Sequence, residues 1–220
     1  RGSEFDDVNA VFLLQSQGVK LTPGKDGQIT KAESRSPRAS SAEMKLLAQR
    51  PVLGELTLAH ADLSRKGAES LSRLWQLESL DLAECDVSDE AVAELHQLPK
   101  LGWLSLSRTE VSNAALSSDG FAKLRVLHLA ETRIDDDGLT AVGGMPNLVW
   151  LDLAETAVSS KGLESLGDLE KLEWLDLSGT AINDSACDSL AKLPSLKILV
   201  LNGTGISNSG LEVLSGCPRL

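Results

Sequence analysis

Ser105, His128 and Asp152 are the residues of this sequence that could support nucleophilic catalysis, because they supply a hydroxyl, an imidazole and a carboxylate. In a catalytic triad these groups form a chain of hydrogen bonds beside an oxyanion hole. Here they occupy the same position in three successive repeats, which would place them on neighbouring strands about 4.8 Å apart. That separation is long for the required hydrogen bonds, and no oxyanion hole or nucleophile turn is recognisable. We therefore expect no catalytic residues and no hydrolysis of generic esters.

A metal site is the second chemical possibility, with His128, Asp152 and Asp176 as its ligands. Structural metals usually take His and Cys side chains in closed coordination spheres, whereas these three residues would lie on an open surface. The three cysteines are an odd number for a disulfide framework, and Cys187 and Cys217 replace apolar residues of the repeat described below. We expect structural cysteines, no metal and no cofactor.

The element that would position these residues is an internal repeat of 24 residues, shortened to 23 in one unit. Each unit begins with the pattern L-x-x-L-x-L. The first leucines of seven complete units, and of an eighth that starts at the last residue, are Leu53, Leu77, Leu101, Leu124, Leu148, Leu172, Leu196 and Leu220. Self-similarity at a fixed period is typical of a solenoid, in which each unit buries its apolar face only by stacking on its neighbours.

The columns of the repeat predict a strand followed by a turn. The first, fourth and sixth positions are apolar, as in Leu148, Leu151 and Leu153. The fourth and sixth alternate with outward positions, which is the periodicity of a strand. The ninth position is threonine in five units, from Thr109 to Thr204, and its hydroxyl can satisfy backbone groups at the turn.

Helix signals come next in every unit. The twelfth position always holds a residue type that is favoured at helix N-caps. Its members are Ser64, Ser88, Ser112, Asp135, Ser159, Asn183 and Ser207. Three residues later comes Gly or Ala, which lets the helix approach the core closely. Because strands pack about 4.8 Å apart and helices need about 10 Å, the stack should bend with its strands on the concave face.

The run L-x-x-L-D-L-x-x-T-x-[VI]-[SN]-x-x-[GA]-x-x-x-L, clearest at 148–166 and 172–190, resembles the short leucine-rich repeats common in bacterial proteins. Thr replaces the usual Asn at the ninth position, and it is frequent there in this bacterial subtype. The resemblance implies an α/β fold, a right-handed leucine-rich-repeat solenoid with a parallel sheet on the concave face and short helices on the convex face. It also implies a binding role, and the family has no shared catalytic residues.

The third position of the repeat points away from the core and carries most of the tryptophans. Aromatic residues are only 3% of the chain, yet three of its four tryptophans fall in this column; the fourth, Trp75, is expected to cover the core edge. The column reads Glu55, Ser79, Trp103, Val126, Trp150, Trp174 and Ile198. An exposed apolar stripe usually marks a binding surface, and Trp is common at binding hot spots. The alternative is a structural ladder in which the rings pack on one another.

Acidic residues border this stripe at the fifth and eighth positions of the repeat. The candidate binding residues are Trp103, Val126, His128, Trp150, Asp152, Trp174, Asp176 and Ile198. An aromatic stripe beside carboxylates suits a protein partner with Lys or Arg next to apolar side chains. Carbohydrate binding is one alternative, because Trp rings also stack on sugars and carboxylates bond hydroxyls. A structural spacer within a larger protein is another.

Composition narrows the classes of partner. The net charge is −11, from 32 acidic and 21 basic residues, so the basic footprint that nucleic acid or an anionic membrane would need is absent. No stretch approaches the apolar length of a membrane span, and we expect no membrane insertion. The compartment stays open, because Arg1–Phe5 (RGSEF) resembles a remnant of an expression vector in place of a native start.

The chain is expected to divide into the vector remnant at 1–5, an N-terminal cap with a degenerate first repeat at 6–52, and seven repeats plus the start of another at 53–220. The cap should contain an amphipathic helix over 6–17 and a hairpin or loop over 19–32. Its degenerate unit would start at Ile29 and place Ser40 in the N-cap column. At the other end, the strand around 199–201 should present an unpaired edge. We expect further repeats or a covering segment at this edge in the native protein, because Leu220 opens another unit in register; self-association through the edge is the third possibility and would concern the fragment.

Overall fold

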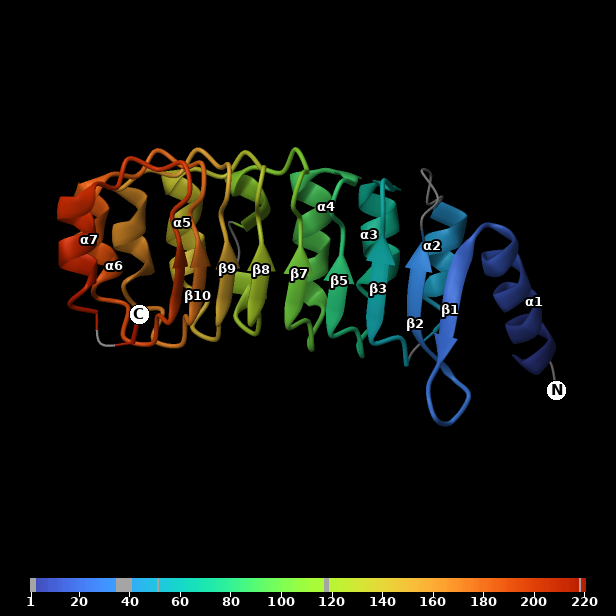
Figure 1. Cartoon of the computed structure of the whole chain (residues 1–220). Helices are drawn as coiled ribbons and strands as arrows, with labels where there is room; N and C mark the ends of the chain where they lie inside the picture. Colours follow the sequence, from blue (N-terminus) through green and yellow to red (C-terminus); the bar gives the residue numbers. More distant parts are fainter. Residues whose placement is uncertain (1–2, 35–40, 51, 117–118, 218) are drawn as a thin grey trace.

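A nine-stranded sheet runs through the length of the fold, and a short helix or helical turn comes after most of its strands (Figure 1). The structure is a computed structural model that describes residues 3–34, 41–50, 52–116, 119–217 and 219–220. In their order across the sheet the strands are β1 (Val19–Pro23), β2 (Ile29–Ser34), β3 (Glu55–Leu58), β5 (Ser79–Asp81), β7 (Trp103–Ser105), β8 (Val126–His128), β9 (Trp150–Asp152), β10 (Trp174–Asp176) and β11 (Ile198–Val200). β1 and β2 are antiparallel, and every later pair in this sheet is parallel.

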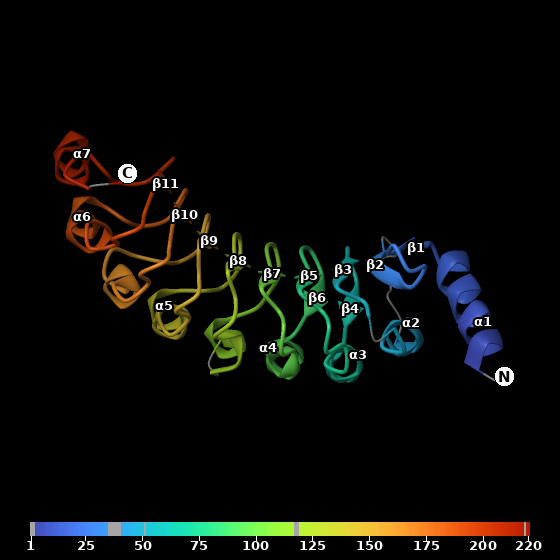
Figure 2. The same cartoon turned by 90° about the horizontal axis from the view of Figure 1, so that it is seen from below.

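The helices line the side of the arc opposite the strands. Seen from below, the strands lie along the inner side of the curve and α3, α4, α5 and α6 along its outer side (Figure 2). The α-helices are α1 (Ser3–Ser16), α2 (Ser41–Leu47), α3 (Arg65–Leu71), α4 (Asp89–Glu94), α5 (Asp136–Gly143), α6 (Cys187–Leu190) and α7 (Asn208–Leu214). None of the helices in the described ranges is long and apolar enough to cross a membrane. The predicted α/β solenoid with strands on its concave face is therefore confirmed.

Residues 3–34 form a helix and a hairpin. α1 begins at Ser3, three residues earlier than predicted, and ends at Ser16 shortly before Gly18, whose φ is +86°. β2 pairs in parallel with β3, with Lys31 opposite Glu55, so Ile29 aligns with the first position of the later units. This register is the one expected of a degenerate unit that starts at Ile29. Ser40, the predicted cap of this unit, lies outside the described residues.

A buried polar pair replaces two core residues of this degenerate unit. Ser34 stands in the leucine column and is 1% exposed, and Glu43 stands in the Gly/Ala column and is 2% exposed. The Ser34 hydroxyl donates a hydrogen bond of 2.8 Å to Glu43 Oε1. A buried carboxylate is costly without such a partner, so the two departures from the pattern compensate each other.

The leucine columns build one continuous core. Leu148, Leu151 and Leu153 are fully buried, and the first leucines of the seven complete repeats are at most 3% exposed. Cys187 is 1% exposed in an apolar column, as predicted. Cys85 is also buried, and burial raises the pKa of its thiol to about 11. That thiol therefore stays protonated near neutral pH and packs as a small apolar group.

Threonine hydroxyls close the turn after each strand in the later repeats. The ninth-position hydroxyls donate to the carbonyl of the residue three positions earlier, over 2.6 to 2.8 Å. Cys85 takes this position in its unit, but its Sγ donates over 2.8 Å to the Leu58 carbonyl of the preceding unit. The predicted role of the threonine column is confirmed.

The helix caps also behave as predicted. All seven twelfth-position side chains accept a backbone N–H from one of the next two or three residues. The segment after the cap differs between units, because three of them begin with 3₁₀ turns rather than α-helix. The 3₁₀ helices are η1 (Leu95–Gln97), η2 (Asn113–Leu116), η3 (Asp119–Phe121), η4 (Gly162–Leu166) and η5 (Asp184–Ala186). The unit containing η2 and η3 is the one that is a residue shorter.

An inter-repeat ladder, which the repeat pattern did not predict, joins the caps to one another. From the second repeat onward, the residue after each cap accepts the backbone N–H of the cap in the next unit, over 2.7 to 3.1 Å. The five pairs are Asp89 with Ser112, Asn113 with Asp135, Asp136 with Ser159, Ser160 with Asn183, and Asp184 with Ser207. Hydrogen bonds from Ser207 hold the pKa of Asp184 below its ordinary value.

The ladder gives a second reason for the small residues three positions after the cap. A Cβ added at Gly162 would collide with the carboxylate of Asp136, and one added at Gly210 would collide with that of Asp184. Glycine therefore makes room for a side chain of the preceding unit. The column reflects contact between repeats as well as contact between helix and core.

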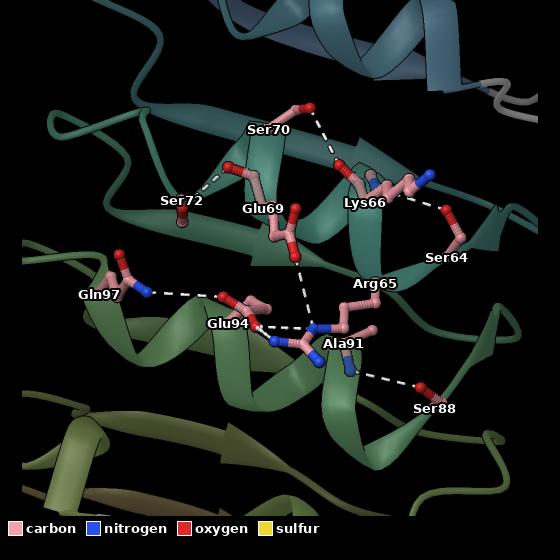
Figure 3. Close-up of polar contacts among 11 residues, drawn as sticks. Ser64, Arg65, Lys66, Glu69, Ser70, Ser72, Ser88, Ala91, Glu94 and Gln97 are labelled. Carbon is pink, nitrogen blue, oxygen red and sulfur yellow. Dashed lines mark hydrogen bonds and ion pairs between the residues drawn. The ribbon is translucent and has the colours of Figure 1, made fainter.

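On the convex side, an arginine links the first two repeat helices (Figure 3). Arg65 of α3 lies 2.9 Å from Glu94 Oε1 of α4 through Nη2, and 3.4 Å from Glu69 Oε1 on its own helix through Nε. The short β4 (Asp62–Leu63) and β6 (Asp86–Val87) pair in parallel between the same two units. In these two units, an ion pair and a strand pair take the place of the ladder.

Candidate binding face

The strand register brings the candidate residues into two rows across the concave face. Trp103 pairs with Val126, Val126 with Trp150, Trp150 with Trp174, and Trp174 with Ile198. The fifth-position residues pair in the same way, in the order Ser105, His128, Asp152, Asp176 and Val200. Both rows have the order that the repeat alignment predicts.

Four rings from the two rows form a continuous aromatic row across β7, β8, β9 and β10, consisting of Trp103, His128, Trp150 and Trp174. Trp150 and Trp174 are stacked, with ring centroids 3.9 Å apart and an interplanar angle of 14°. The His128 centroid lies 5.3 Å from that of Trp103 and 6.3 Å from that of Trp150, with tilted planes. The stacked pair is the ladder that the sequence left open as an alternative.

The tryptophans are less exposed than we expected for an open stripe. Trp103, Trp150 and Trp174 are half-buried, because the rings cover one another. The indole Nε1 of Trp150 is buried and has no hydrogen-bond partner among the described residues. Ile198, at the end of the row, is 53% exposed. Part of the apolar ring surface is therefore covered within the row, and Ile198 is its most exposed neighbour.

The three triad-like residues do not form a complete relay in the part of the chain that the structure describes. His128 Nδ1 lies 3.4 Å from Asp152 Oδ2, which is a closer approach than the strand spacing suggested. Their side chains are 23% and 18% exposed. Ser105 is 5% exposed, and within the described ranges its hydroxyl forms no hydrogen bond to His128. Among the same residues no group of three or more His, Cys, Asp or Glu is arranged to hold a metal ion.

The aspartates of the fifth position have a structural role that sequence reasoning missed. Asp81, Asp152 and Asp176 each accept, through Oδ1, the backbone N–H of the residue two positions later, over 2.8 to 3.1 Å. Such side-chain turns stabilise the backbone where a strand ends. One oxygen of each aspartate is therefore committed to the fold, and the other oxygen of Asp152 lies 3.4 Å from His128 Nδ1.

The eighth position is left-handed in every unit. Its members, with φ between +55° and +68°, are His60, Glu84, Arg108, Glu131, Glu155, Gly179 and Gly203. Arg108 lies 3.0 Å from Glu84 Oε1 and 2.8 Å from Glu131 Oε1, and these carboxylates raise the pKa of its guanidinium. The edge that we expected to be acidic is thus partly neutralised at Glu84 and Glu131.

A basic edge borders the opposite, starting ends of the strands, and sequence reasoning missed it. It consists of Lys100, Lys123, Arg125 and Lys171, all exposed. The three lysines share one column, directly before the first leucine of a repeat, and this spacing was the available signal. Their ammonium groups donate to neutral acceptors of the preceding unit, namely the side chains of Gln76 and Asn147 and the carbonyl of Pro99.

A shallow hollow of about 530 Å³ connects the basic edge to the aromatic row. Trp103, Val126 and Trp150 contribute apolar lining. Its polar lining is Glu78, Lys100, Lys123 and Arg125. Trp75, which we expected to cover the core edge, lies outside the hollow and is 52% exposed. Lys100 Nζ lies 5.8 Å from the Trp75 ring centroid.

Comparisons with known families match separate parts of this solenoid. Models of the leucine rich repeat match residues 122–182 and, for a second such model, residues 77–95 and 192–215. No curated protein sequence matches the chain significantly.

Solved structures share the fold at low sequence identity. An internalin (inlF) from Listeria monocytogenes aligns with a TM-score of 0.66 and 22% identity over 80% of this chain and 48% of its own. The Arabidopsis receptor kinase HAESA, solved with the peptide hormone IDA and the co-receptor SERK1, aligns with a TM-score of 0.62 and 16% identity over 91% of this chain and 42% of its own. This chain thus spans less than half the length of either structure. The repeats, the sheet and the family matches together identify it as a leucine-rich-repeat protein.

Proposed function

We propose that this chain is a protein-interaction module that binds its partner across the aromatic row of the concave face. The observation that carries the proposal is the row itself, in which rings from four adjacent strands lie partly exposed on a curved sheet. Trp is frequent at binding hot spots because it offers a large rigid contact area. HAESA was solved in complex with a peptide hormone and a co-receptor, which supports partner binding by this fold.

A partner segment with Lys or Arg beside an apolar side chain fits the ends of the strands. Glu155 is exposed there, and Asp176 offers the oxygen that does not accept from Ser178. The apolar side chain would lie against Trp174 and Ile198, the more exposed end of the row. Opposite charges around such a contact contribute mainly to specificity and to the rate of association.

Carbohydrate binding has weaker support from the ring geometry. A sugar stacks on an open aromatic face, whereas Trp150 and Trp174 cover one face of each other at 3.9 Å. Trp103 has His128 beside it at 5.3 Å. The two functions also differ in their response to salt, because screening weakens exposed ion pairs and leaves sugar stacking largely unchanged.

Replacing Trp174 by alanine should weaken partner binding by about tenfold or more, because it removes a partly exposed ring of the proposed contact surface and the stack that orients Trp150. The measurement compares the proteins that immobilised wild-type chain and Trp174→Ala retain from an extract of the source cells, followed by titration calorimetry with the purified partner. Phe12→Ala is the matched control, since Phe12 is an aromatic residue 69% exposed on α1, away from the face. Equal retention by all three proteins would contradict the proposal and favour a structural spacer.

The outer edge of the sheet offers a separate contact, and we propose that it supports weak self-association. β11 is the last strand of the described sheet, and its Ile198 is 53% exposed; Leu211 of α7, the last described helix, is 51% exposed. Exposed strand edges pair with other chains. We expect light scattering over a concentration series to show dimer formation that Val200→Lys abolishes. A wild-type chain that stays monomeric at high concentration would rule this contact out, and a dimer sensitive only to Trp150→Ala would move it to the aromatic row.

A further inference from the structure

We propose that the hollow at the basic edge binds an acidic, apolar-containing segment of the same protein partner. A carboxylate of that segment would pair with Lys123 and Arg125, and a neighbouring apolar side chain would lie against Trp103, Val126 and Trp150. The inference rests on the proposed protein-binding function and extends it, because it assigns the two borders of the concave face to opposite charges. The partner would then present acidic and basic residues on either side of an apolar stretch.

The first argument is that these cations lack ion-pair partners in a chain rich in carboxylates. The sequence has 32 acidic and 21 basic residues, so partners are not scarce. Elsewhere on the face, Arg108 pairs with Glu84 and Glu131, and Lys197 pairs with Glu173 at 2.8 Å. Within the described ranges the four cations of the basic edge form no such pair. Their charge therefore remains available to an anionic group.

The second argument is that the lysines of the edge are already positioned. Lys123 Nζ donates to the Pro99 carbonyl at 2.7 Å, and Lys171 Nζ donates to Asn147 Oδ1 at 2.6 Å. Asn147 in turn donates to the Ala122 carbonyl at 2.9 Å. Neutral acceptors orient an ammonium group without cancelling its charge, and a preoriented group loses less entropy when it binds a ligand.

The third argument concerns the class of ligand. Three cations and one carboxylate, Glu78, line the hollow beside apolar atoms of Trp103, Val126 and Trp150. An inorganic anion or a sulfated sugar would use the cations and leave the apolar lining exposed to water. A peptide with acidic side chains next to an apolar one uses both parts of the lining, and this complementarity selects it.

The test titrates the ¹⁵N-labelled chain with two peptides that differ only in charge, acetyl-Glu-Glu-Leu-Glu-Glu-amide and acetyl-Gln-Gln-Leu-Gln-Gln-amide. We expect the indole N–H resonances of Trp103 and Trp150 to shift with the acidic peptide, with a dissociation constant on the order of 1 mM, as suits a short flexible ligand. The Gln peptide should shift them at least tenfold less at equal concentration. A heparin-derived oligosaccharide is titrated in parallel.

The double variant Lys123→Gln/Arg125→Gln should weaken binding of the acidic peptide about tenfold or more, because it removes both cations that would pair with the peptide carboxylate. Lys161→Gln/Lys192→Gln changes the net charge equally at exposed sites outside the hollow and should bind as wild type. Three results would overturn the inference: no shift with the acidic peptide, equal loss in both double variants, or tighter binding of the oligosaccharide. None of these results changes the expected effect of Trp174→Ala on partner binding, so the proposed function is tested independently of this inference.

Discussion

Leu127→Ala is expected to lower the free energy of unfolding by about 3 kcal/mol, the typical cost of a cavity left by a buried leucine. Leu127 is fully buried in β8, where the register places it between Leu104 of β7 and Leu151 of β9, which are equally buried. In a solenoid each unit is stabilised mainly by its two neighbours, so a defect in a central repeat weakens two interfaces. Urea denaturation followed by circular dichroism measures the loss.

Val126→Ala is the matched control, because it shortens the adjacent residue of the same strand. Val126 points to the concave face and is half-buried, so its truncation should cost about 1 kcal/mol or less. The ratio of the two effects therefore tests which residues of β8 face inward. Equal midpoints for the two variants would contradict the strand register on which the binding face depends.

Asp136→Ala is expected to lower the free energy of unfolding by about 2 kcal/mol, because hydrogen bonds to a charged group are stronger than neutral ones. Asp136 accepts the Ser159 backbone N–H at 2.7 Å and the Ser159 hydroxyl at 2.6 Å. Both donors belong to the next repeat, and the same hydroxyl accepts the Lys161 backbone N–H just before η4. The change should therefore loosen the fifth repeat as well as destabilise the fold, and amide hydrogen exchange over residues 159–166 measures that loosening.

Asp137→Ala separates the ladder from the general effect of an acidic residue at a helix start. Both aspartates lie in the first turn of α5, so both interact favourably with its dipole. Asp137 is exposed and takes no part in the inter-repeat ladder. Its loss should cost a few tenths of a kcal/mol. If the two variants were equally destabilised, the ladder would contribute nothing beyond helix-dipole electrostatics.

The repeat alone predicted the fold and the two rows of side chains on the concave face. Residues at equivalent positions of identical units must pair across a sheet when the units stack, because a one-residue slip would turn every leucine outward. For this reason Trp103, Trp150 and Trp174 could be placed in one row, and Thr109 and its equivalents at one turn, without coordinates. The local chemistry of caps and turns depends on near neighbours in the chain and was equally readable.

Features that depend on contact between units were decided only by the tertiary structure. Whether Trp150 lies open or stacks on Trp174 depends on side-chain rotamers and on the spacing of two strands, which a column of letters does not contain. The same holds for Asp136 reaching Ser159 and for Arg108 reaching Glu84 and Glu131.

The distribution of unpaired charges over the surface also depends on the fold. The sequence contains more carboxylates than basic side chains. In the fold, long-range ion pairs neutralise part of the acidic edge. Lys123 and Arg125, which line the hollow, have no carboxylate partner among the described residues. Side chains that are 23 or 24 residues apart in the chain meet only when the solenoid closes its turns, so these features belong to the fold and not to the repeat.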